Sequence, residues 1–197
     1  MAAILCVFCL FLALTSAAAW SAPWFCHGHE CPPYELIGEY ETFEERYYNA
    51  SRWIMTGIES TASSVVYDGF MKLYGYTDGE NERSQKIPMT LPVIVATSQS
   101  DKENDRLSIS FYVPPNLDLP APTNADVESL DRPEGRVFVR AFGGIASESD
   151  WLENVSELRE YLLKEGKEFD AKNYVAAGYD PPWKLFFRHN EVWIPAV

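Results

Sequence analysis

The sequence is poor in basic residues and histidines, and it has no long apolar run after its first 19 residues. Its 197 residues include 16 Lys and Arg against 29 Asp and Glu, so the formal charge is −13. Nucleic acids and anionic membranes attract proteins through basic surfaces, which argues against both as partners. Beyond residue 19, no apolar run reaches the length of about 20 residues that a membrane-spanning helix needs.

The N-terminus is the exception, because residues 4–14 are continuously apolar. Small residues follow as far as Ala19, and Trp20 comes next. An apolar segment of about 7–15 residues that ends at a small-residue cleavage site is typical of a secretory signal peptide. We therefore expect a signal peptide over residues 1–19 and a secreted, extracellular product. A retained anchor is the alternative, because the segment begins without Lys or Arg.

Cysteine is also scarce, and two of the four cysteines fall within the predicted signal peptide. The other two, Cys26 and Cys31, flank the segment His27-Gly28-His29-Glu30. In an oxidising compartment this spacing favours a short disulfide loop. Two histidines between two cysteines can also bind Zn²⁺ or Cu²⁺, so a metal site is the alternative.

Two glycosylation sequons remain in the predicted mature chain, at Asn49 and Asn154. An extracellular product would meet the glycosylation machinery, so we expect a glycoprotein.

The rest of the chain divides into two similar halves, separated by a proline-rich loop at residues 114–122. Strand patterns lie at 52–59, 91–97, 107–113, 136–142, 173–179 and 191–195, and helix patterns at 62–76 and 147–164. Each half therefore has the order β-α-β-β. We expect an α+β fold in which the two repeats form a distorted antiparallel β-barrel with two helices packed on it. The predicted organisation is a signal peptide (1–19), an N-terminal arm with the disulfide loop (20–33) and one domain (34–197).

Three separated motifs resemble the SOUL/heme-binding protein family. They are Lys-Ile-Pro-Met-Thr-Leu-Pro-Val at 86–93, Phe-Tyr-Val-Pro at 111–114, and Ala-Gly-Tyr-Asp-Pro-Pro at 177–182 running on to Asn-Glu-Val-Trp at 190–193. The resemblance extends from about Tyr34 to the C-terminus. It implies a domain of two β-α-β-β units and non-covalent binding of heme or a related, metal-free porphyrin.

The resemblance also implies where the tetrapyrrole would lie. In this family it is placed over an apolar patch on the first helix, and basic side chains hold its propionates. The matching residues here are Tyr67, Phe70, Met71 and Tyr74 on the helix, then Lys184 with Arg188 close by. The alternative for the helix residues is ordinary hydrophobic core.

The chain departs from the family at the iron ligand. Some members carry Arg-His-Tyr in the first strand, and that histidine is the proposed ligand; this chain has Arg46-Tyr47-Tyr48. Tyr47 is therefore the candidate heme-iron ligand, although a phenol with a pKa of about 10 needs ferric iron or a nearby cation to deprotonate. Packing of Tyr47 within the sheet is the alternative. We expect His189 in a surface turn, while His27 and His29 reach the pocket only if the arm folds back.

The leading hypothesis is an extracellular carrier or buffer of heme. A binder of another amphipathic small molecule, or a protein-interaction module on the same fold, is the alternative. An enzyme is the third candidate, because Glu39, Glu41, Glu44 and Glu45 cluster around the first strands and a glutamate in a pocket can act as a general base. We do not expect an enzyme, since the sequence has no nucleophile elbow, metal signature or phosphate loop.

Overall fold

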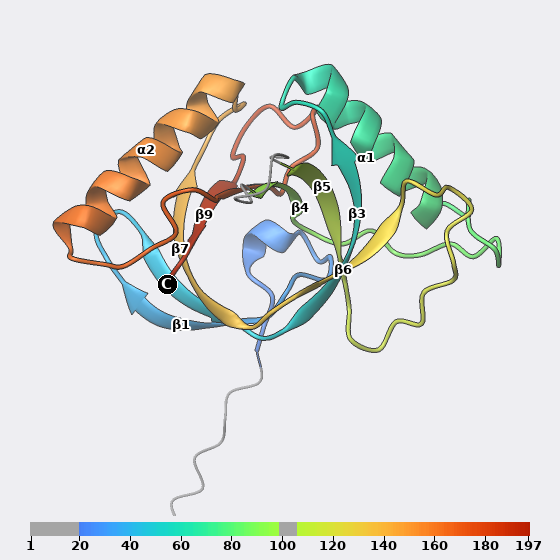
Figure 1. Ribbon diagram of the computed structural model, residues 1–197, viewed down its shortest axis with the longest axis horizontal. Helices are drawn as coiled ribbons and strands as arrows, with labels where there is room; N and C mark the ends of the chain where they lie inside the picture. Colours follow the sequence, from blue (N-terminus) through green and yellow to red (C-terminus); the bar gives the residue numbers. More distant parts are fainter. Residues whose placement is uncertain (1–19, 99–105) are drawn as a thin grey trace, which may run out of the picture.

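The computed structural model describes residues 20–98 and 106–197 of the chain (Figure 1). The predicted signal peptide lies outside the described residues. The strands are β1 (Tyr34–Glu39), β2 (Glu44–Tyr48), β3 (Ser51–Ile58), β4 (Val93–Ser98), β5 (Arg106–Val113), β6 (Glu128–Arg132), β7 (Gly135–Phe142), β8 (Val175–Gly178) and β9 (Asn190–Pro195). The helices are α1 (Ser63–Thr77), α2 (Glu148–Lys164) and the 3-10 helix η1 (Trp24–Cys26). None of the described helices has the length and hydropathy needed to cross a membrane.

The strands form one nine-stranded antiparallel sheet in the order β1-β2-β7-β9-β8-β4-β5-β3-β6. The two predicted repeats are β3-α1-β4-β5 and β7-α2-β8-β9, and they meet where β4 pairs with β8. In both repeats the first strand lies outermost and the second lies at the junction. This equivalent order confirms the predicted α+β fold of two β-α-β-β units with a pseudo-twofold relation.

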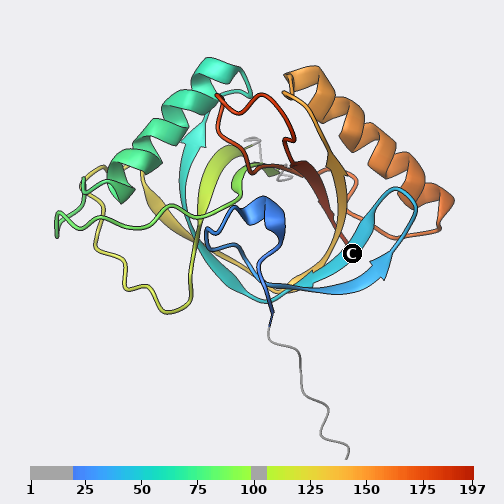
Figure 2. The same cartoon turned by 180° about the vertical axis from the view of Figure 1, so that it is seen from behind.

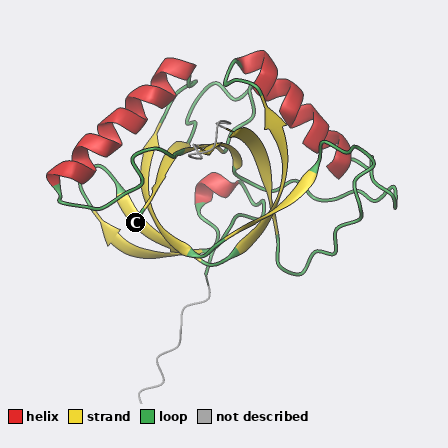
Figure 3. Cartoon of the chain, in the orientation of Figure 1, coloured by secondary structure: helices red, strands yellow, loops and turns green. Residues whose placement is uncertain are grey.

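The sheet curls strongly but its ladder remains open (Figure 3). Within the described residues, β1 pairs only with β2 and β6 only with β3. The predicted distorted barrel is therefore a curled sheet with two edges. One of these edge strands, β6, was not predicted, because its sequence Glu-Ser-Leu-Asp-Arg is largely exposed and polar.

Side chains alternate between the two faces of the curled sheet, so each face has its own buried residues. The concave face forms one cluster, and the convex face forms two, one under each helix. On β3, Trp53 faces the concave interior, whereas Ile54 faces α1. Helix α1 packs on β3 and β5, and α2 packs on β7 and β9. Both helices lie outside the curve of the sheet (Figure 1). The concave interior, the α1 contact and the α2 contact are the three clusters of buried residues.

The N-terminal arm joins the concave cluster. It contains the predicted disulfide between Cys26 and Cys31, and both cysteines are buried together with Phe25. These side chains pack in the same cluster as Trp53 and Trp193. Figure 2 shows the arm within the ring that the sheet outlines. The arm therefore folds back and fills one end of the curled sheet.

Candidate functional site

The candidate site is a cleft over the two central strands. Because each helix covers the outer strands of its own repeat, the helix-side face of β4 and β8 lies between α1 and α2. Ile94 faces the interior, so Val93 and Val95 point into the gap. Opposite them on β8 are Ala176 and Gly178, which are too small to fill it. Because β8 offers only small side chains here and neither helix covers β4, a hollow remains between α1 and α2.

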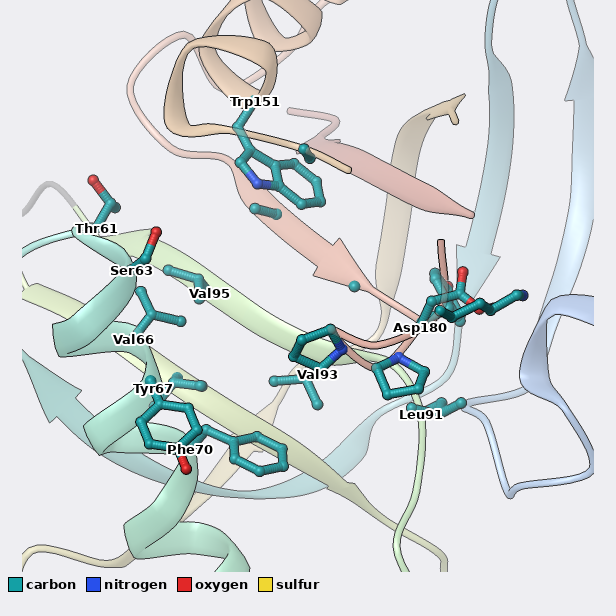
Figure 4. A pocket seen from close by; sticks show the side chains of 18 of the residues that line it. Thr61, Ser63, Val66, Tyr67, Phe70, Leu91, Val93, Val95, Trp151 and Asp180 are labelled. Carbon is teal, nitrogen blue, oxygen red and sulfur yellow. The ribbon is translucent and has the colours of Figure 1, made fainter. Parts of the chain in front are cut away.

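The resulting cavity has a volume of about 1070 Å³. This is just above the range of about 300–1,000 Å³ that is usual for ligand pockets. In Figure 4, Val66, Tyr67 and Phe70 from α1 lie on one side of the pocket and Trp151 from α2 lies on another. Most lining side chains are apolar, so the cleft suits a large ligand with an apolar body.

All four predicted residues of α1 line the cleft. The residues Tyr67, Met71 and Tyr74 are 58%, 41% and 43% exposed, so they form a wall with about half of its surface open to solvent. Phe70 is partly buried and contacts Phe111 with ring centroids 5.4 Å apart. The four residues therefore differ in their surroundings. Phe70 lines the cleft and also packs against the core, whereas the other three residues line the cleft only.

The predicted cation Lys184 also lines the cleft, but an acidic partner already holds it. Its Nζ donates to Oδ1 of Asp180 at 2.5 Å, and His27 Nε2 lies 2.8 Å from the same oxygen. Burial favours a higher pKa for Asp180, but hydrogen bonds from Lys184, the backbone N–H of His189 and His27 outweigh it and lower the pKa. This end of the cleft therefore carries a compensated pair of charges.

Arg188 is not among the residues that line the cleft. Its guanidinium donates instead to three backbone carbonyls, those of Asp180, Pro181 and Lys184, at 3.1, 2.7 and 2.9 Å. These bonds brace the loop that bears Lys184. The structure thus places Arg188 behind the site, where it positions the loop.

Tyr47 does not line the cleft either. It lies on β2 between Glu35 of β1 and Arg136 of β7, on the side of the strand opposite the buried Arg46. Desolvation and the neighbouring Glu134 raise the pKa of its phenol, which disfavours tyrosinate. Tyr47 is thus a partly exposed strand residue that lies away from the cleft.

The disulfide loop contributes two histidines to the cleft. His27 contacts Asp180, as described above, and His29 Nδ1 lies 3.0 Å from the backbone oxygen of Met89. The backbone N–H of Leu91 donates to the oxygen of Glu30 at 2.9 Å, which fixes the loop against the segment entering β4. The condition set by the sequence, that the arm must fold back, is met.

The surface position expected for His189 is wrong. Its side chain is only 13% exposed and stacks on Phe25 with ring centroids 3.9 Å apart. Its Nε2 lies 2.8 Å from Oε1 of Glu191. The turn that carries His189 is covered by the arm, which the sequence pattern did not place.

Glu191 is a fully buried carboxylate behind the cleft. Arg46 donates to both of its oxygens, at 2.9 and 3.2 Å, and Tyr179 and Trp193 each donate to Oε2 at 2.7 Å. Burial opposes the charged form, but the hydrogen bond from His189 and the charge of Arg46 lower the pKa of Glu191 to about 2. Since Tyr179 also lines the cleft, this network supports one of its walls.

The acidic residues considered for catalysis lie elsewhere, and none of them lines the cleft. Glu44 binds Arg46 at 2.6 Å, and Glu45 is paired with Arg136 and Lys167 at 3.1 and 2.9 Å. Glu44 and Glu45 are therefore both engaged in ion pairs with basic side chains.

The two sequons differ in accessibility. Asn49 is exposed between β2 and β3. The amide of Asn154 lies within α2, where it donates to the oxygen of Asp150 at 2.8 Å and accepts from Arg140 at 3.0 Å. Of the two, Asn49 has the more accessible side chain.

Sequence reasoning missed the floor of the cleft and its second wall. The pattern indicates only strands at Val93, Val95, Ala176 and Gly178, and only a core-facing stripe at Trp151 of α2. The loop after β8 was also missed as an exposed apolar feature. It presents Trp183, Leu185, Phe186 and Phe187 with exposures of 81%, 61%, 75% and 88%. The cluster Trp-Lys-Leu-Phe-Phe in a loop was the available signal.

Comparison with known proteins assigns the family. The profile of the SOUL heme-binding protein family matches residues 29–195. Heme-binding protein 2 of Homo sapiens is 39% identical over 158 residues, covering 78% of this chain and 77% of that protein. Heme-binding protein 1 of Xenopus laevis is 31% identical over 156 residues, covering 77% of this chain and 82% of that protein.

Among solved structures, a hydrolase from Listeria innocua superimposes with a TM-score of 0.54 and covers 82% of this chain and 94% of its own. Its sequence identity is 10%, so this likeness shows a shared fold alone. The profile match and the curated relatives carry the assignment: the chain belongs to the SOUL heme-binding protein family.

Proposed function

We propose that this protein binds heme or a related porphyrin non-covalently in the cleft between α1 and α2, and that it acts as an extracellular carrier or buffer rather than as an enzyme. The observation that carries the proposal is the apolar cleft of about 1070 Å³ over the uncovered faces of β4 and β8. The family of the chain and the names of its relatives support the choice of ligand.

The residues of the cleft fit a porphyrin. A planar macrocycle needs apolar walls, and Tyr67 and Met71 supply exposed apolar surface on α1 opposite Trp151 of α2. Burying about 400 Å² of such a ligand contributes about 10 kcal/mol. Association costs at least about 4 kcal/mol, so burial alone leaves a Kd no tighter than tens of micromolar. Apolar contact therefore suffices for moderate binding.

The compensated charges at the Lys184 end of the cleft suggest a second candidate ligand beside heme. Because Asp180 already neutralises Lys184, a propionate must share or displace this partner. That observation favours a flat, weakly charged molecule as the alternative. Hemin and its dimethyl ester separate the two: tighter binding of hemin indicates a propionate contact, and tighter binding of the ester indicates a neutral ligand.

The binding experiment uses two matched charge insertions. Tyr67→Glu places a carboxylate on the exposed wall of the cleft, whereas Leu163→Glu changes an exposed apolar residue of α2 that does not line it. Titration with hemin and with iron-free protoporphyrin, followed by absorbance and tryptophan quenching, should show weaker binding for Tyr67→Glu only. No saturable binding of either porphyrin by the unmodified protein would refute the proposal.

The extracellular part of the proposal rests on the N-terminal sequence and on the disulfide between Cys26 and Cys31. Disulfides persist in oxidising compartments and are rare in the cytosol. Expression of the full chain in cultured secretory cells, with the mass of the product measured in the medium, tests this. Cleavage after Ala19 and glycan at Asn49 are expected. An intact N-terminus on a cytosolic product would contradict it.

A further inference from the structure

The three histidines of the chain use their ring nitrogens differently. His189 is enclosed against Phe25, and its Nε2 contacts Glu191. His27 lines the cleft, but Asp180 engages its Nε2 at 2.8 Å and Lys184 Nζ lies 3.5 Å from the same nitrogen, so only Nδ1, the ring nitrogen next to the backbone, is left for a ligand. His29 also lines the cleft, and its contact uses Nδ1 only.

The partner of His29 fixes which of its nitrogens carries the proton. Nδ1 lies 3.0 Å from the backbone oxygen of Met89, and a carbonyl can only accept. Nδ1 is therefore the donor, and in the neutral ring Nε2 keeps its lone pair. Nε2 has no hydrogen-bond partner within residues 20–98 and 106–197. Metal-binding histidines typically have this arrangement, with the second ring nitrogen donating to a carbonyl or carboxylate.

The loop that carries His29 is anchored on both sides. The disulfide between Cys26 and Cys31 closes it, and the N–H of His29 donates to the oxygen of Cys26 at 2.8 Å. The backbone oxygen of Glu30 accepts a hydrogen bond from the N–H of Leu91. Figure 4 places Leu91 at the same end of the cleft as Asp180. The imidazole is thus held beside the cleft before any ligand enters, which reduces the entropy lost on binding.

We propose that His29 is the axial ligand through which this protein binds heme iron, with Nε2 as the donor atom; this inference rests on the proposed function. Tyr47 does not line the cleft, so the matching position of the family does not supply the donor. The arm, which lies outside the two repeats, supplies it instead. The disulfide and the ligand then belong to one loop.

The test compares porphyrins with and without iron on the mature protein and on His29→Ala. His29 is exposed, so the variant should fold, and its circular dichroism provides the check. Loss of the imidazole should weaken hemin binding at least about tenfold. Removing only a hydrogen-bond partner of a metal-binding residue already lowers metal affinity by about 10–100-fold. Binding of iron-free protoporphyrin should change by less than about twofold, because burial alone holds it. Added imidazole should restore the ferric absorption spectrum.

Two further variants separate the possible ligands. Tyr47→Phe should leave the ferric spectrum unchanged, and His27→Gln tests the neighbouring imidazole. The inference is overturned if His27→Gln or Tyr47→Phe, instead of His29→Ala, alters that spectrum. Equal loss of both porphyrins in His29→Ala also overturns it, since His29 would then only shape the cleft. If the unmodified protein binds neither porphyrin, the proposed function itself fails.

Discussion

Replacing Glu191 by Gln tests the buried network behind the cleft. Gln keeps the shape and an acceptor oxygen for Tyr179 and Trp193, but it removes the buried charged partner of Arg46 and leaves only the partly exposed Glu44 to pair with the guanidinium. The fall in the pKa of Glu191 from 4.5 to about 2 corresponds to about 3 kcal/mol of folding stability at neutral pH. Breaking a buried ion pair costs about 3–5 kcal/mol, which agrees.

The sign of the pH dependence follows from the lowered pKa of Glu191. As the pH falls, Glu191 takes up a proton in the unfolded chain before it does so in the folded protein. Its stabilising contribution is therefore complete above about pH 5 and is lost as the pH falls toward 2. Urea unfolding followed by tryptophan fluorescence should therefore give a difference of about 3 kcal/mol between the unmodified protein and the Glu191→Gln variant at pH 7. That difference should shrink steadily as the pH is lowered to about 3.5.

Glu44→Gln is the matched control for this measurement. Glu44 also pairs with Arg46, at 2.6 Å, but its side chain is 36% exposed. Its loss should cost no more than about 1 kcal/mol, because exposed ion pairs are screened by solvent. Two outcomes would refute the reasoning: a cost below about 1 kcal/mol for Glu191→Gln at pH 7, or a difference from the unmodified protein that does not depend on pH.

Two other substitutions probe how the helices are fixed. Gly69→Ala should destabilise the fold by about 1–3 kcal/mol despite the higher helix propensity of alanine, because the new Cβ would lie 2.8 Å from methyl groups of Ile58 and Ile109; a higher Tm would contradict this. Ser147→Ala should cost about 1 kcal/mol by urea unfolding, because the hydroxyl of Ser147 caps α2 through the N–H of Asp150. A change below a few tenths of a kcal/mol would show that this cap is not needed.

The helices and most strands could be predicted from the sequence because each has a clear periodicity. The helix expected at 147–164 begins one residue later in the structure, with Ser147 as its cap. The strand expected at 136–142 is β7, which begins at Gly135. Such patterns report which side of an element is buried. They do not report how far apart two covering helices lie.

The cleft could not be predicted from the sequence for this reason. Leu-Pro-Val-Ile-Val-Ala-Thr at 91–97 is apolar on both faces, which ordinarily indicates that both faces are covered. The helix-side face of β4, with Val93 and Val95, is instead the open floor of the cleft. Its exposure depends on the strand order, which places β4 beside β8 and both helices over the outer strands.

The symmetry of the fold gives the arm a part in orienting a ligand. The two repeats meet at β4 and β8, so their helices form roughly equivalent walls on either side of the cleft. Equivalent walls cannot distinguish the two ends of a bound molecule. The ends differ because the arm and the loop after β8 lie at one of them, where His29, Lys184 and Asp180 gather. Because Phe25 of the same arm also packs in the concave core, the segment that fills one end of the curled sheet is also the one that makes the two ends of the cleft different.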